Sequence, residues 1–403
     1  MSKRTPLRIG LFGFGVVGQG LYDVLQKAVA FEADIARICV RDRTKQRPFT
    51  SPLFTYDAND VLNDPDIDVV VELIDDAEAA FDIVTSAMRK GKSVVSANKR
   101  LIATRLHELL DVQRQTGASF LYEASTGGSI PVIRNLEEYY DNDTLSTVEG
   151  IVNGTTNFIL SALHTSGTAD YSSALSEAQA AGFAERDPTL DVEAYDVAYK
   201  TAIIAAHAYG VVVEPERIVR RGIRSVIPFD VEIATQMSRT IKLLSNASLN
   251  DDRLSILSMP AFVTNSSYLS TVNGEYNAIR LKGAFSDSQV LVGKGAGGTP
   301  TASAVLSDLA ALHNGYRYRY KKIGRAQRPI IDNAVAVRLY ARGSASTLAE
   351  IPFTRVLIEH NSSSGRYVIG YVRLDSLSRC PAFEDADCFM AIIYDGEESQ
   401  QPL

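Results

Sequence analysis

Short apolar runs recur along the first third of the chain, and stretches with helical spacing of apolar residues separate most of them. A parallel strand covered by helices on both faces is apolar along its whole length, and it needs a crossover to the next strand. The pattern therefore predicts an α/β domain with a Rossmann-type, doubly wound parallel sheet. The expected strands are residues 7–12, 35–41, 67–74, 93–98 and 119–124, and the expected helices follow Gly18 and cover 77–90 and 103–115.

The pattern changes after about residue 140. A long helical stretch at 173–209 precedes strand-like runs, which is typical of an α+β domain with a mixed or antiparallel sheet. A glycine-rich loop near residue 297 then leads into a further helix, and a small β-rich module follows it. The expected strands are 254–263, 276–284 and 288–293, and then 334–341, 354–360, 366–374 and 388–394.

The composition excludes several classes of function. The formal net charge of −7 argues against a nucleic-acid partner, because phosphate contacts need a clustered basic surface. No apolar run is long enough to predict a membrane partner. Cys39, Cys380 and Cys388 are too few for a disulfide framework, so the composition predicts only a soluble, cytoplasmic globular protein.

A glycine motif lies between the first expected strand and the first expected helix. In such a motif the glycines permit a tight turn, a close approach of the backbone to a pyrophosphate, and close packing of helix on strand. A glycine triplet alone often marks only a turn, but the strand–loop–helix context favours dinucleotide binding. The motif consists of Gly13, Phe14, Gly15, Val16, Val17 and Gly18.

The end of the second expected strand bears on the choice of cofactor. Arg41 and Arg43 flank Asp42 there, with Lys45 and Arg47 close behind. An acidic residue at this place binds the ribose hydroxyls of NAD, whereas arginine suits the 2′-phosphate of NADP. The basic excess favours NADP(H), with NAD(H) as the alternative. A solvated surface loop explains Lys45 and Arg47 nearly as well.

Three further residues carry candidate chemistry. Lys99 follows the carboxyl end of a predicted strand, where ligands of open α/β sheets collect. Asp196 and Lys200 lie one helical turn apart, at the mouth of an apolar helix. The plain alternative is a surface ion pair, which contributes little to stability. A carboxylate–ammonium pair at the mouth of a buried helix instead favours a functional site. His207 in the same helix is expected to be a core histidine.

Several longer blocks resemble the homoserine dehydrogenases. Residues 153–160 (NGTTNFIL) resemble the NGTTN signature of that family, and residues 182–200 resemble its signature of a glutamate, an Asp-Pro pair and an Asp-x-x-x-Lys end. The resemblance covers roughly residues 7–320. Several long motifs in the family order make it far more specific than the glycine loop. The other blocks are SANK at 96–99, YEASTGGSIPVI at 122–133 and GKGAGGTPTASAVLSDL at 293–309.

The resemblance implies reversible, NAD(P)H-dependent reduction of L-aspartate 4-semialdehyde to L-homoserine, in threonine, methionine and isoleucine biosynthesis. It makes Lys99 and Lys200 the active-site lysines, with Lys200 or a water that it holds protonating the substrate oxygen. Asp196 and Glu185 would orient Lys200 and the substrate amino group. Asp191, Asn153, Gly154 and Thr155 would complete the substrate pocket, and Gly295 and the residues up to Thr299 would lie near the cofactor.

The resemblance also implies a site for Na⁺ or K⁺, although the cofactor itself carries the redox chemistry. Its ligands would be Glu123 and the main-chain carbonyls of Thr126, Gly128 and Ile130. It further implies a homodimer and, because the match begins near residue 7, a monofunctional enzyme.

Together the pattern and the resemblance predict four segments. They are an NAD(P)-binding Rossmann domain at 1–140, a substrate-binding and dimerisation domain at 141–300, a helix returning to the nucleotide domain at 301–330, and a β-rich C-terminal extension at 331–403.

The chain departs from the family pattern in two places. Asp75 and Asp76 stand where many members have a glycine pair, so we expect this loop to turn outward or to contact a cation. Some members end in a regulatory ACT domain of βαββαβ order that senses threonine. Residues 331–403 lack a clear first helix and the usual glycine-containing ligand loop, so we expect a degenerate ACT-like extension rather than a competent threonine sensor.

Two rival assignments remain open at this point. One is another Rossmann dehydrogenase that reduces a different amino-acid aldehyde or imine, and the blocks at 153–160 and 182–200 disfavour it. The other is a non-catalytic, amino-acid-responsive binding protein. Such a protein would have lost a lysine or a glycine, yet Lys99, Lys200 and the glycine triplet are all present.

Overall fold

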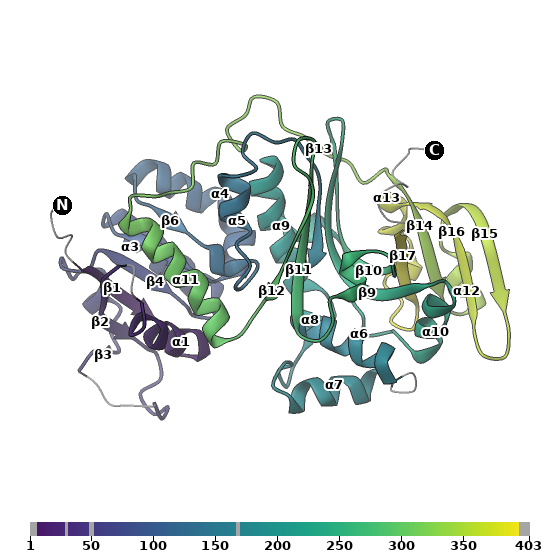
Figure 1. Cartoon of the computed structure of the whole chain (residues 1–403), viewed down its shortest axis with the longest axis horizontal. Helices are drawn as coiled ribbons and strands as arrows, with labels where there is room; N and C mark the ends of the chain where they lie inside the picture. The colour runs from purple at the N-terminus through teal and green to yellow at the C-terminus, as the bar shows by residue number, and fades with distance from the viewer. Residues whose placement is uncertain (1–5, 29–30, 48–51, 167–169, 395–403) are drawn as a thin grey trace. The chain divides into compact units, whose positions relative to one another are not determined.

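The computed structural model describes residues 6–28, 31–47, 52–166 and 170–394. Contacts within the chain divide it into two compact units, and Figure 1 shows the elements of each. The first unit is Met1–Asp141 with Lys294–Lys321, and the second is Asn142–Gly293 with Lys322–Leu403.

The sheet of the first unit has six parallel strands in the order β3-β2-β1-β4-β5-β6. This confirms the predicted doubly wound α/β class. Strand order reverses between β1 and β4, so their carboxyl ends bound the crevice where such sheets bind ligands. The strands are β1 (Leu7–Phe12), β2 (Ala33–Cys39), β3 (Phe54–Thr55), β4 (Val69–Glu72), β5 (Ser93–Ser96) and β6 (Phe120–Leu121).

One helix of the first unit comes from far along the chain. Helix α11 packs against α1, as the green and purple helices of Figure 1 show. A Cβ on Gly20 would lie 2.6 Å from the carbonyl oxygen of Gly298, so glycine at this position allows the close approach. The helices are α1 (Val16–Leu25), α2 (Asn59–Leu62), α3 (Ala77–Arg89), α4 (Lys99–Thr116), α5 (Ile133–Glu137) and α11 (Gly298–His313), with a 3₁₀ turn at Glu123–Ser125.

The second unit contains an eleven-stranded mixed sheet. Its main path is β12-β11-β7-β9-β10-β17-β14-β16-β15, and β8 and β13 also pair with β10. The strands are β7 (Leu145–Ile151), β8 (Val219–Arg220), β9 (Arg239–Asn250), β10 (Arg253–Thr264), β11 (Tyr276–Gly283), β12 (Asp287–Lys294), β13 (Ile330–Ile331), β14 (Ala336–Arg342), β15 (Phe353–Asn361), β16 (Arg366–Arg373) and β17 (Phe389–Tyr394).

The predicted helical stretch at 173–209 forms three helices rather than one. Gly182, at a φ of 78°, lies just after the end of α7, and Pro188 occupies the N-cap of α8. Helix α9 is buried from Asp196 to Tyr209, which includes His207 as expected. The helices are α6 (Gly154–Ser166), α7 (Tyr171–Ala180), α8 (Thr189–Val192), α9 (Tyr195–Tyr209), α10 (Pro228–Gln236), α12 (Ala345–Ala349) and α13 (Leu374–Leu377).

The C-terminal strands follow the βαββαβ order of a ferredoxin-like module. The short helix α12, capped by Ser344, occupies the first helical position, so the expectation of no first helix is corrected. The four strands lie in the order β17-β14-β16-β15, and β17 pairs in parallel with β10. The expected extension is therefore continuous with the sheet of the second unit.

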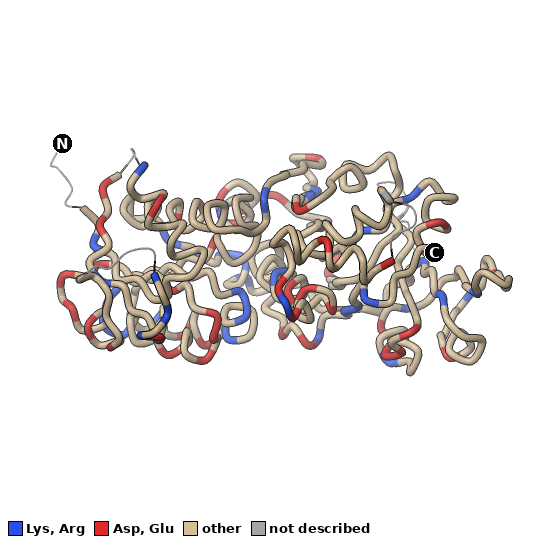
Figure 2. Tube along the Cα trace, turned by 90° about the horizontal axis from the view of Figure 1, so that it is seen from below, with Lys and Arg blue, Asp and Glu red and all other residues tan. Residues whose placement is uncertain are grey.

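Charged side chains do not separate by sign along the chain. Figure 2 shows blue and red residues mixed along the described parts of both units. Among the described helices, none is long and apolar enough to cross a membrane.

Asp230 links α10 to the C-terminal strands. This carboxylate is fully buried and accepts hydrogen bonds from the hydroxyl of Tyr340 at 2.8 Å, Nε of Arg342 at 3.0 Å and the amide of Ile227 at 2.9 Å. Burial raises its pKa, while Arg342 opposes that rise. The carboxylate therefore pairs with the mostly buried guanidinium of Arg342 and caps the start of α10 at the same time.

We predict that Asp230→Ala destabilises the fold by about 3–5 kcal/mol, because it leaves the mostly buried Arg342 guanidinium without its only carboxylate partner among the described residues. Urea unfolding would measure the loss. Arg373→Ala, which breaks the half-exposed ion pair with Asp375, is the matched control and should cost about 1 kcal/mol or less. Equal midpoints for the two variants would contradict the anchoring role.

Candidate active site

The glycine turn after β1 requires glycine for steric reasons. Gly13 has a φ of 92°, and a Cβ there would lie 2.5 Å from the carbonyl oxygen of Leu73. A Cβ on Gly18 would lie 2.6 Å from the carbonyl oxygen of Gly13. Gly15 caps α1 without a side-chain hydrogen bond, so the first amides of this helix remain available to an anion. The turn therefore has the geometry of a dinucleotide phosphate site.

The other residues of the motif divide between core and surface. The side chain of Phe14 is buried, and its ring meets Phe54 edge-on with centroids 5.3 Å apart. Phe14 therefore offers a cofactor only its main chain. Val16 is exposed, and Val17 is half-buried. A Cβ on Gly298 would lie 3.0 Å from the carbonyl oxygen of Val16, so the second glycine loop abuts the first.

The loop after β2 uses its acidic residue internally. Asp42 accepts hydrogen bonds at 2.7 Å from both the amide and the hydroxyl of Thr44, and these bonds lower its pKa. Arg41 is exposed, and the guanidinium of Arg43 lies 4.6 Å from the ring centroid of Tyr56. The loop thus presents guanidinium groups at its surface while its carboxylate stabilises the turn.

The unusual acidic pair after β4 turns outward. Asp75 and Asp76 are both exposed. Asp76 caps α3, because its Oδ1 accepts hydrogen bonds at 3.1 Å from the amides of Glu78 and Ala79. The second carboxylate therefore has a local role as the N-cap of a helix.

Lys99 is the first residue of α4 and is half-buried. Asn98 caps this helix, with its Oδ1 accepting the amide of Leu101 at 2.9 Å. The strand β5 and the cap together place Lys99 at the carboxyl edge of the parallel sheet, as the sequence predicted.

Glu123 is the first residue of the 3₁₀ turn after β6, and its side chain reaches the N-terminus of α5. Its carboxylate accepts the amides of Val132 at 2.6 Å, Ile133 at 2.9 Å and Arg134 at 2.8 Å. Burial raises the pKa of Glu123, and the three amides oppose the rise. Asp308 of α11 accepts the amide of Glu123 at 2.9 Å, and burial followed by the Glu123 charge raises its pKa to about 8.

The neighbouring loop contains the other expected cation ligands. Thr126 and Ile130 are buried, and Gly128 has a φ of 57°. A Cβ on Gly128 would lie 2.5 Å from the carbonyl oxygen of Gly295, so the second glycine loop packs directly on this one. Among the described residues, no group of three or more His, Cys, Asp or Glu side chains is arranged to hold a metal ion.

The second unit brings four of the predicted residues together. The ammonium of Lys200 lies 2.8 Å from Oδ2 of Asp196 and donates to the carbonyl of Val152 at 2.6 Å. Asn153 donates from Nδ2 to Asp191 at 2.7 Å and to Asp196 at 2.9 Å. Lys200 is only 6% exposed and Asp196 only 3%. The cluster is therefore a buried charge network rather than a surface ion pair.

The local backbone explains how the cluster forms. Asn153 caps α6 through the amide of Thr156 at 2.8 Å, so its side chain is fixed. Ala194 adopts a left-handed φ of 61° at the N-cap of α9, a conformation that costs an L-residue energy and is common at functional sites. This bend follows α8, which contains Asp191, and precedes Asp196. A Cβ on Gly154 would lie 2.7 Å from the carbonyl oxygen of Glu275, so the turn before α6 also requires glycine.

Two family profiles match this chain. The profile described as homoserine dehydrogenase matches residues 131–310, and its NAD-binding-domain profile matches residues 13–123. The homoserine dehydrogenase of Bacillus subtilis (strain 168) is 36% identical over 320 residues, which are 77% of this chain and 74% of that relative. The chain belongs to the homoserine dehydrogenase family. It is an NAD(P)-dependent oxidoreductase that acts on the CH–OH group of homoserine, as the sequence predicted.

Solved structures agree with this family. A homoserine dehydrogenase from Thiobacillus denitrificans has a TM-score of 0.84 and 29% identity, and the match covers 97% of this chain and 99% of that one. A hyperthermophilic archaeal homoserine dehydrogenase solved with NADPH has a TM-score of 0.67, with 78% of this chain and 100% of that one covered. At 24% identity this second likeness shows the fold alone.

One predicted residue of this homoserine dehydrogenase stands apart from the cluster. Glu185 lies in an exposed loop, and only its main-chain carbonyl, accepting from Gln179 at 3.0 Å, makes a hydrogen bond within the described chain. Thr155 reaches the same loop, since its hydroxyl donates to the carbonyl of Phe183 at 2.6 Å. The loop is therefore attached to α6 near the site, with the Glu185 carboxylate facing solvent.

The sequence pattern gave no sign of Asn277 on β11. This residue is 1% exposed, and both polar atoms of its amide lack a hydrogen-bond partner within the described part of the chain. Its Oδ1 lies 3.7 Å from the position of a Cβ on Gly154. A buried amide requires a partner, so a water or a ligand atom has to complete this part of the site. No motif pointed to it, because a single asparagine in a strand carries no pattern.

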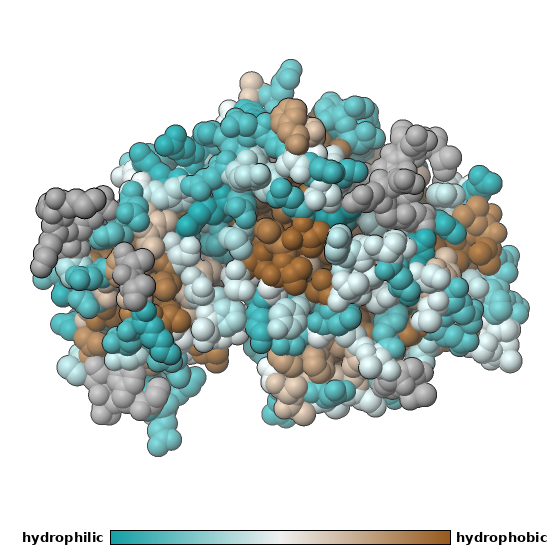
Figure 3. Space-filling model, viewed as in Figure 1, coloured by the Kyte–Doolittle hydropathy of each residue, from teal (hydrophilic) through white to brown (hydrophobic). Residues whose placement is uncertain are grey.

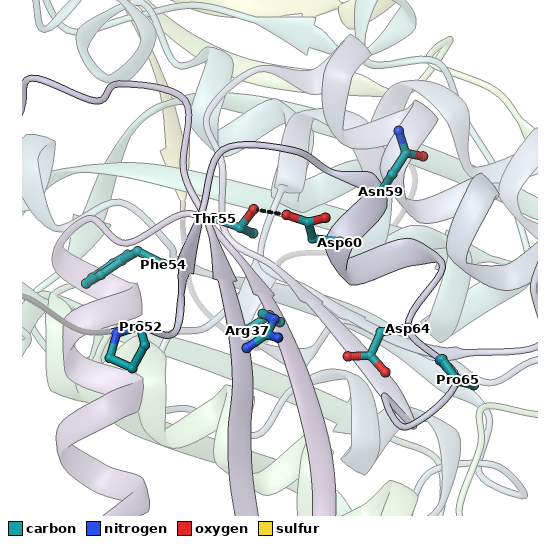
Figure 4. Close-up of a pocket in the computed structure, with 8 residues that line it drawn as sticks. All are labelled: Arg37, Pro52, Phe54, Thr55, Asn59, Asp60, Asp64 and Pro65. Carbon is teal, nitrogen blue, oxygen red and sulfur yellow. Dashed lines mark hydrogen bonds between the residues drawn. The ribbon is translucent and has the colours of Figure 1, made fainter.

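The first unit also contains a cavity of about 510 Å³ beside β2 and β3 (Figure 4). None of the predicted site residues lines it. Its wall includes Arg37, Asp64 and a hydrogen bond between Thr55 and Asp60 at the β3 edge of the sheet.

Proposed function

We propose that this homoserine dehydrogenase reduces L-aspartate 4-semialdehyde with NADPH and that Lys200 donates the proton to the product oxygen. The buried Lys200–Asp196–Asn153–Asp191 cluster is the observation that supports this most strongly. An ammonium held in such a network is oriented before the substrate binds, which is the form of electrostatic catalysis that contributes most.

The proposed roles follow the charges that the reaction requires. Reduced nicotinamide, when bound, supplies a hydride to the aldehyde carbon, and the oxygen then takes one proton to give the primary alcohol. Lys200 polarises that oxygen and donates the proton, while Asp196 holds the ammonium in place. Asp191 and Glu185 bind the substrate ammonium, Lys99 binds its carboxylate, and the amides of Gly154 and Thr155 form the floor of the pocket.

We predict that Lys200→Ala lowers kcat by about 100-fold or more with unchanged affinity for NADPH, because a positioned general acid contributes roughly 10²–10⁴ in rate. Near-ultraviolet absorbance with aspartate semialdehyde measures turnover, and cofactor fluorescence measures binding. Lys27→Ala, an exposed lysine outside the cluster, is the control. Wild-type turnover that survives in Lys200→Ala would contradict the role of Lys200.

The choice of NADPH over NADH rests on the loop after β2. Arg41 and Arg43 stand exposed there, whereas Asp42 is engaged by Thr44. A guanidinium pairs well with a phosphate, and the tied carboxylate is less able to hold the ribose hydroxyls. The archaeal relative in complex with NADPH adds support from a similar fold.

We predict that Arg41→Ala combined with Arg43→Ala raises KM for NADPH by about 10-fold to 100-fold, as expected for the loss of charged hydrogen bonds. KM for NADH should change little, because that cofactor lacks the 2′-phosphate. Arg114→Ala, an exposed arginine on α4, serves as the control. A parallel rise in both KM values would show that these arginines do not read the phosphate.

A monovalent cation, Na⁺ or K⁺, is also part of the proposal. Glu123 and the carbonyls of Thr126, Gly128 and Ile130 would hold it. Among the described residues, Oε2 of Glu123 accepts only the amide of Arg134, and a carboxylate oxygen has room for a further partner. Turnover in buffers with K⁺, Na⁺ or choline as the only cation tests the site. Equal rates in all three buffers would contradict a role for a bound cation.

A homodimer formed through β12 completes the proposal, together with a cytoplasmic location that the three free cysteines support. Strand β12 is an edge of the large sheet and carries the half-buried Val290 and Leu291 beside Val292, which is 58% exposed. Figure 3 shows apolar side chains gathered over β11 and β12. An exposed apolar edge strand needs a partner, and a second copy of this chain provides a matching edge.

We predict that Val292→Glu converts the dimer to a monomer, measured as mass by light scattering, because the carboxylate would be buried in the interface. Val356→Glu on β15, the opposite edge strand, is the matched variant and should leave the mass unchanged. Dissociation by Val356→Glu alone would place the interface at the other edge. A wild-type enzyme that is already monomeric would contradict the dimer.

A further inference from the structure

A buried carboxyl group lies at the carboxyl end of β4, beside the ligand crevice of the first unit. Glu72 is the last residue of that strand and has no solvent exposure. Its Oε1 accepts the amide of Ile74 at 2.7 Å, and its Oε2 accepts the hydroxyl of Ser96 at 2.6 Å. Its neighbours across the sheet, Phe12 on β1 and Ser96 on β5, carry no charge. Neutral donors alone therefore hold this carboxylate.

The hydrogen bonds around Glu72 close into a ring. Ser96, which donates to Glu72, also accepts the amide of Asn98 at 3.1 Å. Asn98 in turn donates from Nδ2 to the carbonyl of Ile74 at 3.0 Å. Ile74 is thus held at its N–H by Glu72 and at its C=O by Asn98. A complete ring of this kind is rigid, because each member fixes the next.

The ring joins two parts of the cofactor and substrate machinery. On one side it holds the loop on which the glycine turn packs, since a Cβ on Gly13 would lie 2.5 Å from the carbonyl oxygen of Leu73 and 3.2 Å from Cγ2 of Ile74. On the other side Asn98 caps α4 through the amide of Leu101 at 2.9 Å, and Lys99 is the first residue of that helix. A shift of the ring would therefore move both.

We propose that Glu72 is a positioning residue for the reduction: through Ser96 and Asn98 it fixes the N-terminus of α4, and with it Lys99, relative to the glycine turn. The inference rests on the proposed role of Lys99. Nothing in the known motifs required it, because Glu72 ends an apolar strand and touches none of the reacting groups.

The protonation state of Glu72 predicts a pH dependence of substrate binding. Burial raises its pKa to about 7, Asp75 in the following loop adds to the rise, and the bonds from Ser96 and Ile74 oppose it. The carboxylate accepts from both donors at once, so the ring is complete above this pKa. Below it, a proton occupies one acceptor position, so either the Ser96 hydroxyl has to turn from donor to acceptor or the Ile74 amide loses its acceptor. We therefore expect substrate affinity to fall as the pH drops through this pKa.

The test compares Glu72→Gln with the wild type and with Glu78→Gln, an exposed glutamate on α3. Glutamine keeps the size of the side chain, but its N–H group either opposes the Ile74 amide or forces the Ser96 hydroxyl to accept where it now donates. We expect KM for aspartate semialdehyde to rise about tenfold or more in Glu72→Gln, with a smaller change in kcat. The acid-side inflection of kcat/KM near the pKa of about 7 should disappear in Glu72→Gln and persist in Glu78→Gln.

Two further variants keep the outcome decisive. Ser96→Ala breaks the ring but keeps the carboxylate, so it should raise the same KM while retaining an inflection, and it decides the case if Glu72→Gln does not fold. Lys99→Ala distinguishes a failure of the proposed role of Lys99 from a failure of the positioning role of Glu72. Full activity in Lys99→Ala would contradict the proposed function of that lysine. Loss of activity in Lys99→Ala together with a wild-type KM and pH profile in Glu72→Gln would overturn the positioning role.

Discussion

An ammonium group that is almost removed from water needs hydrogen-bond acceptors within reach, and a carboxylate among them also neutralises its charge. Lys200 meets this requirement through Asp196, one turn earlier on a buried helix. Asp196 needs a donor of its own, and Asn153 provides it while also capping α6. The strained conformation of Ala194 is then the local cost of starting α9 at the right place. The N-cap of α6 and the start of α9 therefore both support this charge.

The sequence predicted those parts of the molecule in which a residue type is chemically or sterically irreplaceable. The glycine turn belongs to this class, because a Cβ at Gly13 or Gly18 would meet a main-chain carbonyl. The Asp196–Lys200 spacing also does, because two residues four apart on a helix must share a face. In both cases residue type and spacing are enough to place the side chains.

The parts that could not be predicted depend on partners distant in the sequence. Strands β7 and β9 were missed because they bury polar residues, among them Glu149, Lys242 and Asn246, which break the apolar alternation. Lys242 is held by Asn157 at 3.1 Å and by the carbonyl of Val272 at 2.6 Å, and neither partner is near it in the chain. Glu72 was overlooked for the same reason. Its donors come from a loop and from a different strand, and only the folded sheet brings them together.

The pairing of the C-terminal strands with β10 has a consequence for how the tail can vary. Three short strands cover the outer side of β10 in succession: β13 at Arg253–Leu254, β8 at Leu257–Ser258 and β17 at Ala261–Val263. Two of these three, β13 and β17, belong to the C-terminal tail, residues 330–403. The tail is therefore part of the sheet. Its removal would leave backbone amides and carbonyls of β10 unpaired, and an unpaired strand edge promotes aggregation. A relative that loses or exchanges this tail would therefore need another strand or loop to pair with β10 at the same time.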